Sequence, residues 1–277
     1  MGRIKCLVIF VSLVLATAVL SQAQTPPKPK PTPPRSLERD FFKNILRDQK
    51  AIWTAPLHVE RSDAKWMLPS GIGLMTLIAT DRTTGDEIFE SRGQLGASRG
   101  ISYAGSVYGL GAVAGGFYLF GRKKNDYRAR ETGVLSAEAL IDSVIVGSAL
   151  KGITQRGRPS TGHERSEFFE GGNSFPSGHS TQAWAVATVI ANEYKHRRAV
   201  QIAAYSAATA VSIARFTGQK HYLSDVVAGS ALGYAIGRYV YSAHHQDPAI
   251  SKSVWPQITP EFNRGARQYG VALTWDF

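Results

Sequence analysis

A lysine and an arginine seven positions apart, Lys151 and Arg158, could together bind a phosphate group. A lysine point charge beside a guanidinium fork suits a phosphate oxyanion. On one continuous helix this spacing is two turns, which would put both side chains on one face. Gly157 and Pro159 predict instead that the helix ends near Arg158, so that the arginine lies on a loop. Taken alone the pair is weak evidence, because basic residues at a helix end are usually just partners of the helix dipole.

A second group, Pro176-Ser177-Gly178-His179, stands directly before an apolar run. Proline and glycine predict a tight turn, after which the first N–H groups of a helix are free to meet an anion. Ser177 adds a hydroxyl donor, and His179 is placed to hand a proton to a leaving group. The alternative is an ordinary serine N-cap turn followed by a surface histidine.

Arg215, His221 and Asp225 form a third group, ahead of another apolar run. Positions 221 and 225 share a face if both lie on one helical turn. A carboxylate there can accept the proton of one imidazole nitrogen and leave the other as a nucleophile. Arg215 would add a further positive fork. The alternative is a capping aspartate with a solvated histidine nearby.

In order, spacing and residue type, the three groups together resemble the type 2 phosphatidic acid phosphatase / vanadium haloperoxidase superfamily. Its pattern reads Lys-x6-Arg-Pro, then Pro-Ser-Gly-His, then Ser-Arg-x5-His-x3-Asp. This chain matches the first two parts in full and the third from Arg215 onward. Ala214 stands where the family usually has serine. We treat that departure as minor, since the missing hydroxyl is not among the principal phosphate ligands.

The resemblance implies a role for each residue of the three groups. His221 is implied as the nucleophile that forms a phosphohistidine, with Asp225 orienting it. His179 is implied to protonate the departing alkoxide and then to activate water. The remaining residues are implied to hold the phosphoryl oxygens: Lys151, Arg158, Arg215, Ser177 and the backbone N–H of Gly178. Such a site depends on positioning and positive charge.

No cofactor and no metal ion is implied by the resemblance, and the sequence shows no clear metal-ligating pattern. His244 and His245 are adjacent rather than spaced for one helix face, so we expect a solvated pair. A single cysteine, Cys6, excludes an internal disulfide and any multi-cysteine zinc site.

The elements that must position these groups are predicted to be helices. The Ala- and Gly-rich composition of the apolar segments suits close helix packing, so the expected fold is an all-α helical bundle of the family's kind. The segments are Ser36–Ile52, Trp66–Ala79, Ile101–Phe120, Leu135–Leu150, His179–Tyr194, Val200–Arg215 and Ser224–Tyr241, the second ended by Asp81–Gly85. A short irregular or β tail is expected to follow, because Tyr269, Val271, Leu273, Trp275 and Phe277 alternate with smaller or polar residues.

The start of the chain has the layout of a secretory signal peptide. Arg3 and Lys5 precede an uncharged run from Cys6 to Leu20, and small residues follow at a cleavage site. An uncleaved membrane anchor is the alternative, although the run is short for a span. The predicted division is a signal peptide at 1–23, a Pro-rich tether at 24–35, a helical domain at 36–245 and a C-terminal tail at 246–277.

The composition limits the kinds of partner that the protein can bind. The chain has 277 residues, a net charge of +11 and 43% hydrophobic residues, which excludes a wholly disordered protein. A basic protein can bind nucleic acid, an acidic membrane surface or an anionic substrate. Because three of the cations belong to the predicted phosphate pocket, a phosphate ester is expected as the partner and nucleic acid is not.

We therefore expect a phosphatase that is exported, either periplasmic or membrane-associated, and acts outside the cytoplasm. Its substrate would be a lipid phosphate, such as phosphatidate or a polyprenyl pyrophosphate, or a soluble phosphoester. Alternatives are a vanadium-dependent haloperoxidase and a non-catalytic membrane protein that binds lipid phosphate. The six apolar segments that follow Ser36–Ile52 match the number of membrane helices expected in the integral lipid phosphatases of the superfamily. Several are shorter than a membrane span, and a cleavable signal with a tether favours a secreted or peripheral protein.

Overall fold

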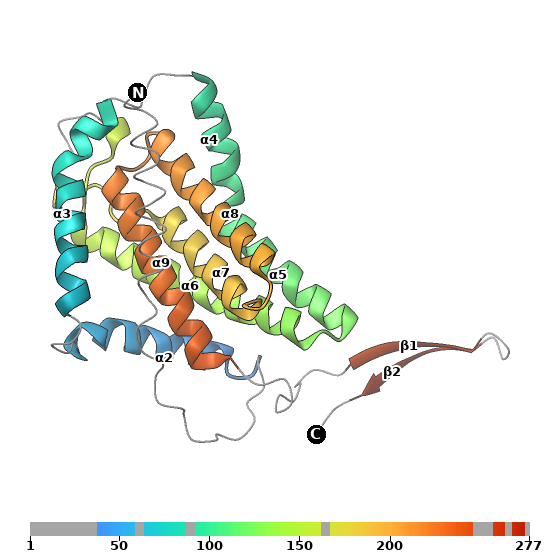
Figure 1. Cartoon of the computed structure of the whole chain (residues 1–277). Helices are drawn as coiled ribbons and strands as arrows, with labels where there is room; N and C mark the ends of the chain where they lie inside the picture. The colour runs from blue at the N-terminus through green and yellow to red at the C-terminus, as the bar shows by residue number, and fades with distance from the viewer. Residues whose placement is uncertain are drawn as a thin grey trace.

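The structure, a computed structural model, is a bundle of helices followed by a β-hairpin (Figure 1). It describes residues 38–58, 64–86, 92–161, 167–245, 257–263 and 268–274. The helices are α2 Phe41–Thr54, α3 Ala64–Asp86, α4 Arg92–Ala104, α5 Val107–Lys124, α6 Tyr127–Thr154, α7 Gly178–Glu193, α8 Arg198–Thr217 and α9 Leu223–His244, with short 3-10 turns η1 Ala55–His58 and η2 Pro159–Thr161. The all-α helical bundle predicted from the sequence is confirmed.

The hairpin pairs β1 Gln257–Asn263 antiparallel with β2 Gln268–Thr274. Tyr269, Val271 and Leu273, whose alternation predicted a strand, lie on β2. Trp275 and Phe277 lie outside the described residues, as do the predicted signal peptide and Pro-rich tether. The division of the chain into those segments therefore stays a prediction.

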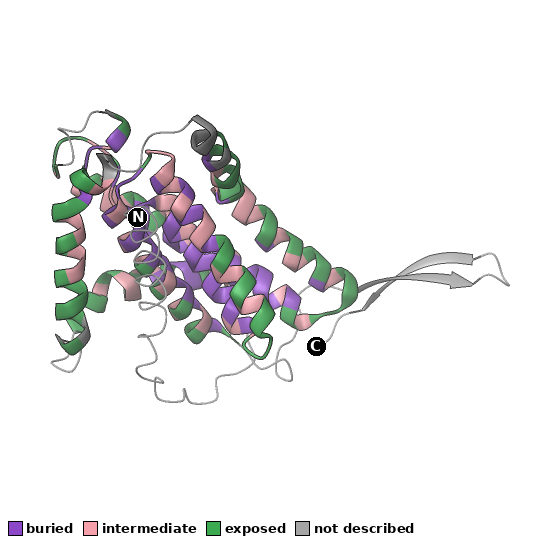
Figure 2. Ribbon diagram, turned by 45° about the horizontal axis from the view of Figure 1, so that its top comes forward, coloured by how far each residue is buried: buried purple, intermediate pink, exposed green. Residues whose placement is uncertain are grey.

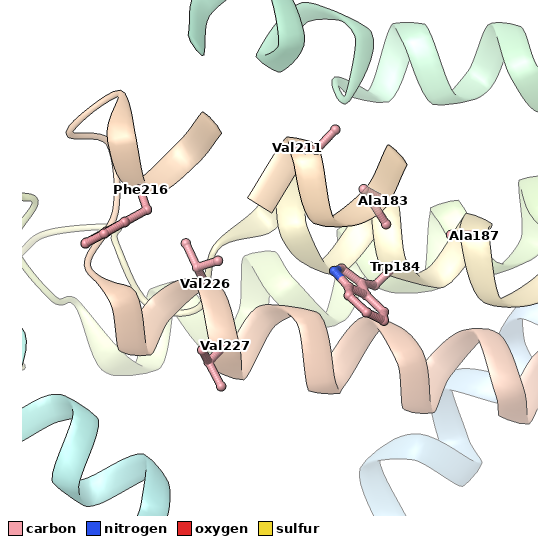
Figure 3. Packing of buried hydrophobic residues seen from close by; sticks show 8 residues of the cluster. Ala183, Trp184, Ala187, Val211, Phe216, Val226 and Val227 are labelled. Carbon is pink, nitrogen blue, oxygen red and sulfur yellow. The ribbon is translucent and has the colours of Figure 1, made fainter. Parts of the chain in front are cut away.

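The core surrounds α7, which packs against α6, α8 and α9. Figure 2 shows that the buried residues gather on these central helices. One apolar cluster joins Trp184 of α7 to Val211 of α8 and Val226 of α9 (Figure 3). The indole N–H of Trp184 also donates a hydrogen bond to Ser212 Oγ at 3.2 Å, which satisfies the one polar atom of that side chain.

A line of glycines lets α9 lie directly on the backbone of α7. Gly229, Gly233 and Gly237 are spaced four apart and so share one helix face. A Cβ atom at Gly233 would lie 2.1 Å from the carbonyl oxygen of Thr181, and one at Gly237 would lie 2.3 Å from that of Ala185. No side chain fits at either position. The two helices therefore run closer together than larger residues would allow, and the start of α7 is fixed against the start of α9.

Several predicted helices have different bounds in the structure, and two of the differences are explained by local contacts. The helix predicted to end after Ala79 continues to Asp86, because Asp81 is buried among polar partners and does not face solvent as a terminator. The predicted segment Ile101–Phe120 consists of two helices, with the break at Gly105 and Ser106. Ser106 caps α5 by accepting a hydrogen bond from the amide of Gly109 at 3.3 Å, which provides the break with a local cause.

The expectation that His244 and His245 form a solvated pair was wrong for His244, which is buried, while His245 is exposed. His244 is 7% exposed, and its Nε2 lies 2.7 Å from Asp48 Oδ1. His245 Nδ1 lies 3.3 Å from Glu131 and 3.4 Å from Glu193, and hydrogen bonds to these carboxylates raise the pKa of His245 to about 9. His244 is therefore buried against Asp48, whereas the exposed His245 pairs with two carboxylates.

Among the described helices, α6 alone has the length and the hydropathy needed to cross a bilayer. Its most apolar stretch has a mean hydropathy of 1.6, and 61% of that stretch is buried inside the protein. Core helices of soluble proteins share these properties, so this is weak evidence for a membrane span.

Candidate active site

The residues singled out from the sequence meet at one end of the bundle, where α6 and α8 end and α7 and α9 begin. A Cβ atom on Gly178 would lie 3.6 Å from Lys151 Cε, which places the start of α7 beside the lysine. The amide of Ser177 donates to the carbonyl oxygen of Asp225 at 2.9 Å, which joins the second group to the third. The three groups, far apart in sequence, are therefore adjacent in space.

Asn173 connects the two basic residues of the first group. Helix α6 ends at Thr154, and Gln155 adopts a left-handed conformation with φ 45°, so the chain turns away before Arg158. Lys151 Nζ donates to the backbone carbonyl of Asn173 at 2.7 Å, while Arg158 Nε donates to its side-chain Oδ1 at 2.8 Å. The arginine lies on a loop, as the glycine and proline beside it predicted. Asn173 was missed by the sequence analysis, because nothing in its neighbourhood marks it.

Ser177 and Gly178 form the start of α7. Ser177 is the N-cap residue, but its side chain makes no capping hydrogen bond. Its hydroxyl, which is fully buried, instead accepts a hydrogen bond from Ser180 Oγ at 3.0 Å. The hydroxyl hydrogen of Ser177 and the first N–H groups of the helix remain suited to an anion.

His221 and Asp225 do not share a helical turn as predicted. His221 precedes α9, whereas Asp225 lies in its first turn and caps the helix through the amide of Tyr222, which donates to Oδ2 at 2.9 Å. His221 Nδ1 lies 3.7 Å from Asp225 Oδ2. The hydroxyl of Ser174 lies between them, 3.4 Å from Nδ1, and donates to Oδ2. The carboxylate thus faces Nδ1 of the imidazole and leaves Nε2 as the nitrogen that can react.

A buried arginine that the sequence analysis did not single out holds Asp225 from the other side. Arg156 is 0% exposed, and its guanidinium donates to Asp225 Oδ1 at 2.6 Å and to Asp81 Oδ2 at 2.8 Å. Its plane is covered by the rings of Phe168 and Tyr222, whose centroids lie 4.9 Å and 4.5 Å away. Cation–π contacts of this kind stabilise a desolvated guanidinium. Asp225 is therefore held between Ser174 and a rigid cation.

Ser224 completes this network. Its hydroxyl accepts from Arg156 at 2.7 Å and donates to Asp81 Oδ2, and its amide donates to Asp81 Oδ1 at 3.1 Å. Burial raises the pKa of Asp81, although hydrogen bonds from Ser224 and Arg156 oppose that shift. Burial would also raise the pKa of Asp225, but contacts with His221, Arg156 and Ser174 outweigh it and lower the pKa. Asp225 is thus held as a carboxylate.

The positive charge around His179 is not balanced by carboxylates paired with these cations. Burial and the charges of Arg158 and Arg215 lower the pKa of Lys151 to about 8. Burial and Arg158 lower the pKa of Arg215 to about 10. Within the described part of the chain, Arg215 Nε is buried without a hydrogen-bond partner, and neither Arg215 nor Lys151 pairs with a carboxylate. This is the electrostatic pattern of a site that binds an anion.

Both histidines are uncharged in the free site. Burial and the charges of Arg215 and Lys151 lower the pKa of His179 to about 4. Burial lowers the pKa of His221 to about 4 as well, in spite of Asp225. A neutral imidazole has a free lone pair, which a nucleophile or a base requires.

The segment that carries these features matches a known family. Residues 132–248 match the sequence model of the PAP2 superfamily. This segment is similar to the PAP2 superfamily. It contains every residue that the resemblance implied, and it contains Arg156, Asn173 and Ser174, whereas Asp81 lies outside it on α3.

Two known proteins are similar to parts of the chain. A lipid A 1-phosphatase from Porphyromonas gingivalis is 32% identical over 103 residues. The match covers 37% of this chain and 23% of that protein, so the chain matches less than a quarter of its relative's length. A solved structure, the first transmembrane PAP2-type phosphatidylglycerolphosphate phosphatase from Bacillus subtilis, is 22% identical with a TM-score of 0.46. That likeness covers 74% of this chain and 94% of the other.

Lys151 is expected to make anion binding by the PAP2 segment depend on pH. Its pKa of about 8 means that it is charged below pH 8 and loses its charge above. The inhibition constant of inorganic phosphate or vanadate is therefore expected to rise as the pH increases through 8. Lys151→Arg, which stays charged, should remove this rise. The constants are measured by competition at a series of pH values; a wild-type constant that stays flat from pH 7 to pH 9 would contradict the prediction.

Proposed function

We propose that the chain is a phosphatase that hydrolyses phosphate monoesters of lipids through a phosphohistidine intermediate. The observation that carries this proposal is the set of cations Lys151, Arg158 and Arg215 around His179, next to a buried His221. The name of the Porphyromonas relative favours a lipid phosphate over a soluble ester. The substrate itself, such as phosphatidate, a lipid A phosphate or a polyprenyl pyrophosphate, is part of the proposal.

In the proposed first step His221 Nε2 attacks phosphorus as the bond to the alkoxide breaks. Asp225 stabilises the positive charge that develops on the ring, because its carboxylate faces Nδ1 directly and through Ser174. His179 gives its proton to the alkoxide, which leaves as an alcohol. A bound phosphate neutralises the surrounding cations and so raises the low pKa of His179, which allows this residue to carry the proton.

In the second step water attacks the phosphohistidine, and His179, now neutral, takes a proton from it. His221 returns to its neutral form, and when phosphate leaves, His179 releases the proton that it took from water, which restores the starting site. The three cations, Ser177 and the amide of Gly178 hold the phosphoryl oxygens in both steps. They supply the positive charge that a metal ion provides in other phosphatases, so we propose that the reaction is metal-independent.

An exposed apolar surface favours membrane association. On α3, at the left of Figure 2, Leu68, Ile72 and Met75 are exposed, and on α5 so are Leu119 and Phe120. Monomeric soluble proteins rarely expose apolar side chains in such groups. We propose that these helices contact lipid, and that the site acts outside the cytoplasm after export.

The proposal is tested by assaying washed membranes and the soluble fraction of expressing cells for phosphate release. The substrates are phosphatidate, lipid A, a polyprenyl pyrophosphate and p-nitrophenyl phosphate. We expect activity on a lipid substrate in the membrane fraction, inhibited by vanadate. Activity on p-nitrophenyl phosphate alone, in the soluble fraction, would contradict the lipid assignment. Vanadate-dependent bromide oxidation by hydrogen peroxide would indicate a haloperoxidase, and binding without turnover would indicate a non-catalytic protein.

A further inference from the structure

A second polar cluster is buried far from the candidate active site, where α2 crosses α6 and the end of α9 (Figure 1). Its members are Asp48 of α2, Glu138 and Asp142 of α6, and His244 of α9. The three carboxylates are 0% exposed and His244 is 7% exposed. One ligand atom each from Asp48, Glu138 and His244 lies within 4.8 Å of the other two. Asp48, Glu138 and His244 come from three helices and converge on one point, and Asp142 lies one turn after Glu138 on α6.

The carboxylate oxygens of this cluster outnumber the hydrogen-bond donors that face them. Asn44 Nδ2 donates to Glu138 Oε1 at 3.1 Å, and Gln49 Nε2 donates to Asp142 Oδ1 at 2.8 Å. The second oxygens, Glu138 Oε2 and Asp142 Oδ2, are buried without a hydrogen-bond partner in the described part of the chain, as is Asn44 Oδ1. A buried carboxylate oxygen without a partner is costly. Three such oxygens in one cluster need a donor or a cation that the described side chains do not supply.

The charges lead to the same conclusion. Within the described residues, His244 is the one basic side chain that pairs with any of the three carboxylates, and it contacts Asp48 alone, at 2.7 Å and 2.9 Å. One histidine cannot pair with three carboxyl groups. By contrast, the neighbouring cluster formed by Glu131, Glu193 and His245 shares one imidazole between two acids and is 36% exposed at the histidine side chain. Of its carboxylate oxygens, Glu193 Oε1 is buried without a hydrogen bond in the described part of the chain, but it lies 3.4 Å from that imidazole.

We propose that Asp48, Glu138, Asp142 and His244 bind one divalent transition-metal ion. Carboxylate oxygens with a single imidazole nitrogen suit Zn²⁺ or Mn²⁺, whereas Mg²⁺ and Ca²⁺ prefer oxygen ligands throughout. Metal–ligand bonds of about 2.0–2.2 Å need ligand atoms roughly 3–4 Å apart, which small side-chain shifts provide. Binding replaces the contact between His244 Nε2 and Asp48.

The ion would stabilise the fold and would take no part in phosphoryl transfer. Glu138 precedes Lys151 by about 20 Å along α6, at 1.5 Å per residue. Asp48 lies on α2, outside the PAP2 segment at 132–248. The metal would therefore attach α2 to the two PAP2 helices α6 and α9.

The test measures metal content and thermal stability of the full chain, purified without a histidine tag. Zn²⁺ and Mn²⁺ are quantified by mass spectrometry after dialysis. Melting temperatures are then compared after chelation and after each ion is returned. We expect about one ion per chain, and a rise in Tm of at least about 5 °C when the preferred ion is added to chelated protein.

The variant Glu138→Gln is expected to retain less than about a tenth of the ion and to lose the rise in Tm. Without metal, this variant should melt at or above the wild-type temperature, since it removes one buried carboxylate. Glu131→Gln is the matched control, a buried carboxylate on the same helix that pairs with His245, and it should bind the ion as wild type does. Asp142→Asn is the second test variant and replaces Glu138→Gln if that protein does not fold.

Two outcomes would overturn the proposal. One is a wild-type chain that holds no ion and whose Tm does not respond to Zn²⁺ or Mn²⁺. The other is an ion retained equally by Glu138→Gln and Asp142→Asn, which would place it elsewhere. Neither outcome bears on phosphatase activity, because the readouts are metal content and melting temperature.

Discussion

His221→Ala is expected to lower kcat by about 10⁴-fold or more and to abolish covalent labelling of the protein. The reason is that the proposed reaction has no other nucleophile, and removal of a nucleophile costs an enzyme most of its rate enhancement. The measurement uses ³²P-labelled p-nitrophenyl phosphate, with the reaction stopped in detergent at alkaline pH, where phosphohistidine persists. His179→Ala should accumulate label, because p-nitrophenolate leaves without a proton while the second step still needs a base.

His196→Ala is the matched control, since His196 is exposed beyond the end of α7. It should label and turn over as wild type does. Label on the His221→Ala variant at the wild-type level would rule out His221 as the nucleophile. Label that fails to accumulate in His179→Ala would leave His221 in its role but remove the base from His179.

Arg156→Met is expected to lower the free energy of unfolding by about 3–5 kcal/mol, the cost of breaking a buried ion pair from one side. It leaves Asp81 and Asp225 buried without their cation. Turnover should also fall, because Asp225 is no longer held against His221. Vanadate binding by the folded fraction should change little, since the fully buried guanidinium does not reach the phosphate pocket. Stability is measured by denaturant titration and kcat by phosphate release.

Two companion variants separate charge from geometry at this position. Asp81→Asn combined with Arg156→Met should recover part of the lost stability, because one unpaired carboxylate has been removed. Arg156→Lys keeps the charge but lacks the planar guanidinium that reaches Asp81 and Asp225 with two separate nitrogens. We therefore expect kcat to stay low while stability recovers in part. An Arg156→Met protein with wild-type stability and turnover would show that the network is dispensable.

The sequence indicated the helical bundle and the residues of the candidate site, because periodicity and motif spacing are local properties of the chain. The relation between His221 and Asp225 was harder to predict. Four positions look like one helical turn, but the helix begins at Leu223, so the histidine lies before it and Ser174 mediates the contact. Spacing alone does not reveal where a helix starts when the capping residue is also the presumed catalytic aspartate.

The role of Arg156 could not be predicted from its own neighbourhood. It lies within the Lys151–Arg158 motif, where a further arginine looks like one more surface cation. Its function depends on Asp81, which comes from a helix far upstream, and on two aromatic rings that cover it. The metal-ligand cluster escaped notice for the same reason, since Asp48 and His244 are at opposite ends of the described bundle sequence.

The glycines of α9 have a consequence for recognising related chains. They make the separation of His179 and His221 depend on how two helices touch, and not on the loops that carry the motif letters. A chain with the same three motifs but larger residues at the positions of Gly229, Gly233 and Gly237 would hold its helices further apart. Such a chain would have the motif residues but could not bring His179 and His221 close enough to act together. These three positions therefore distinguish chains that can form the site from chains that only carry its motifs.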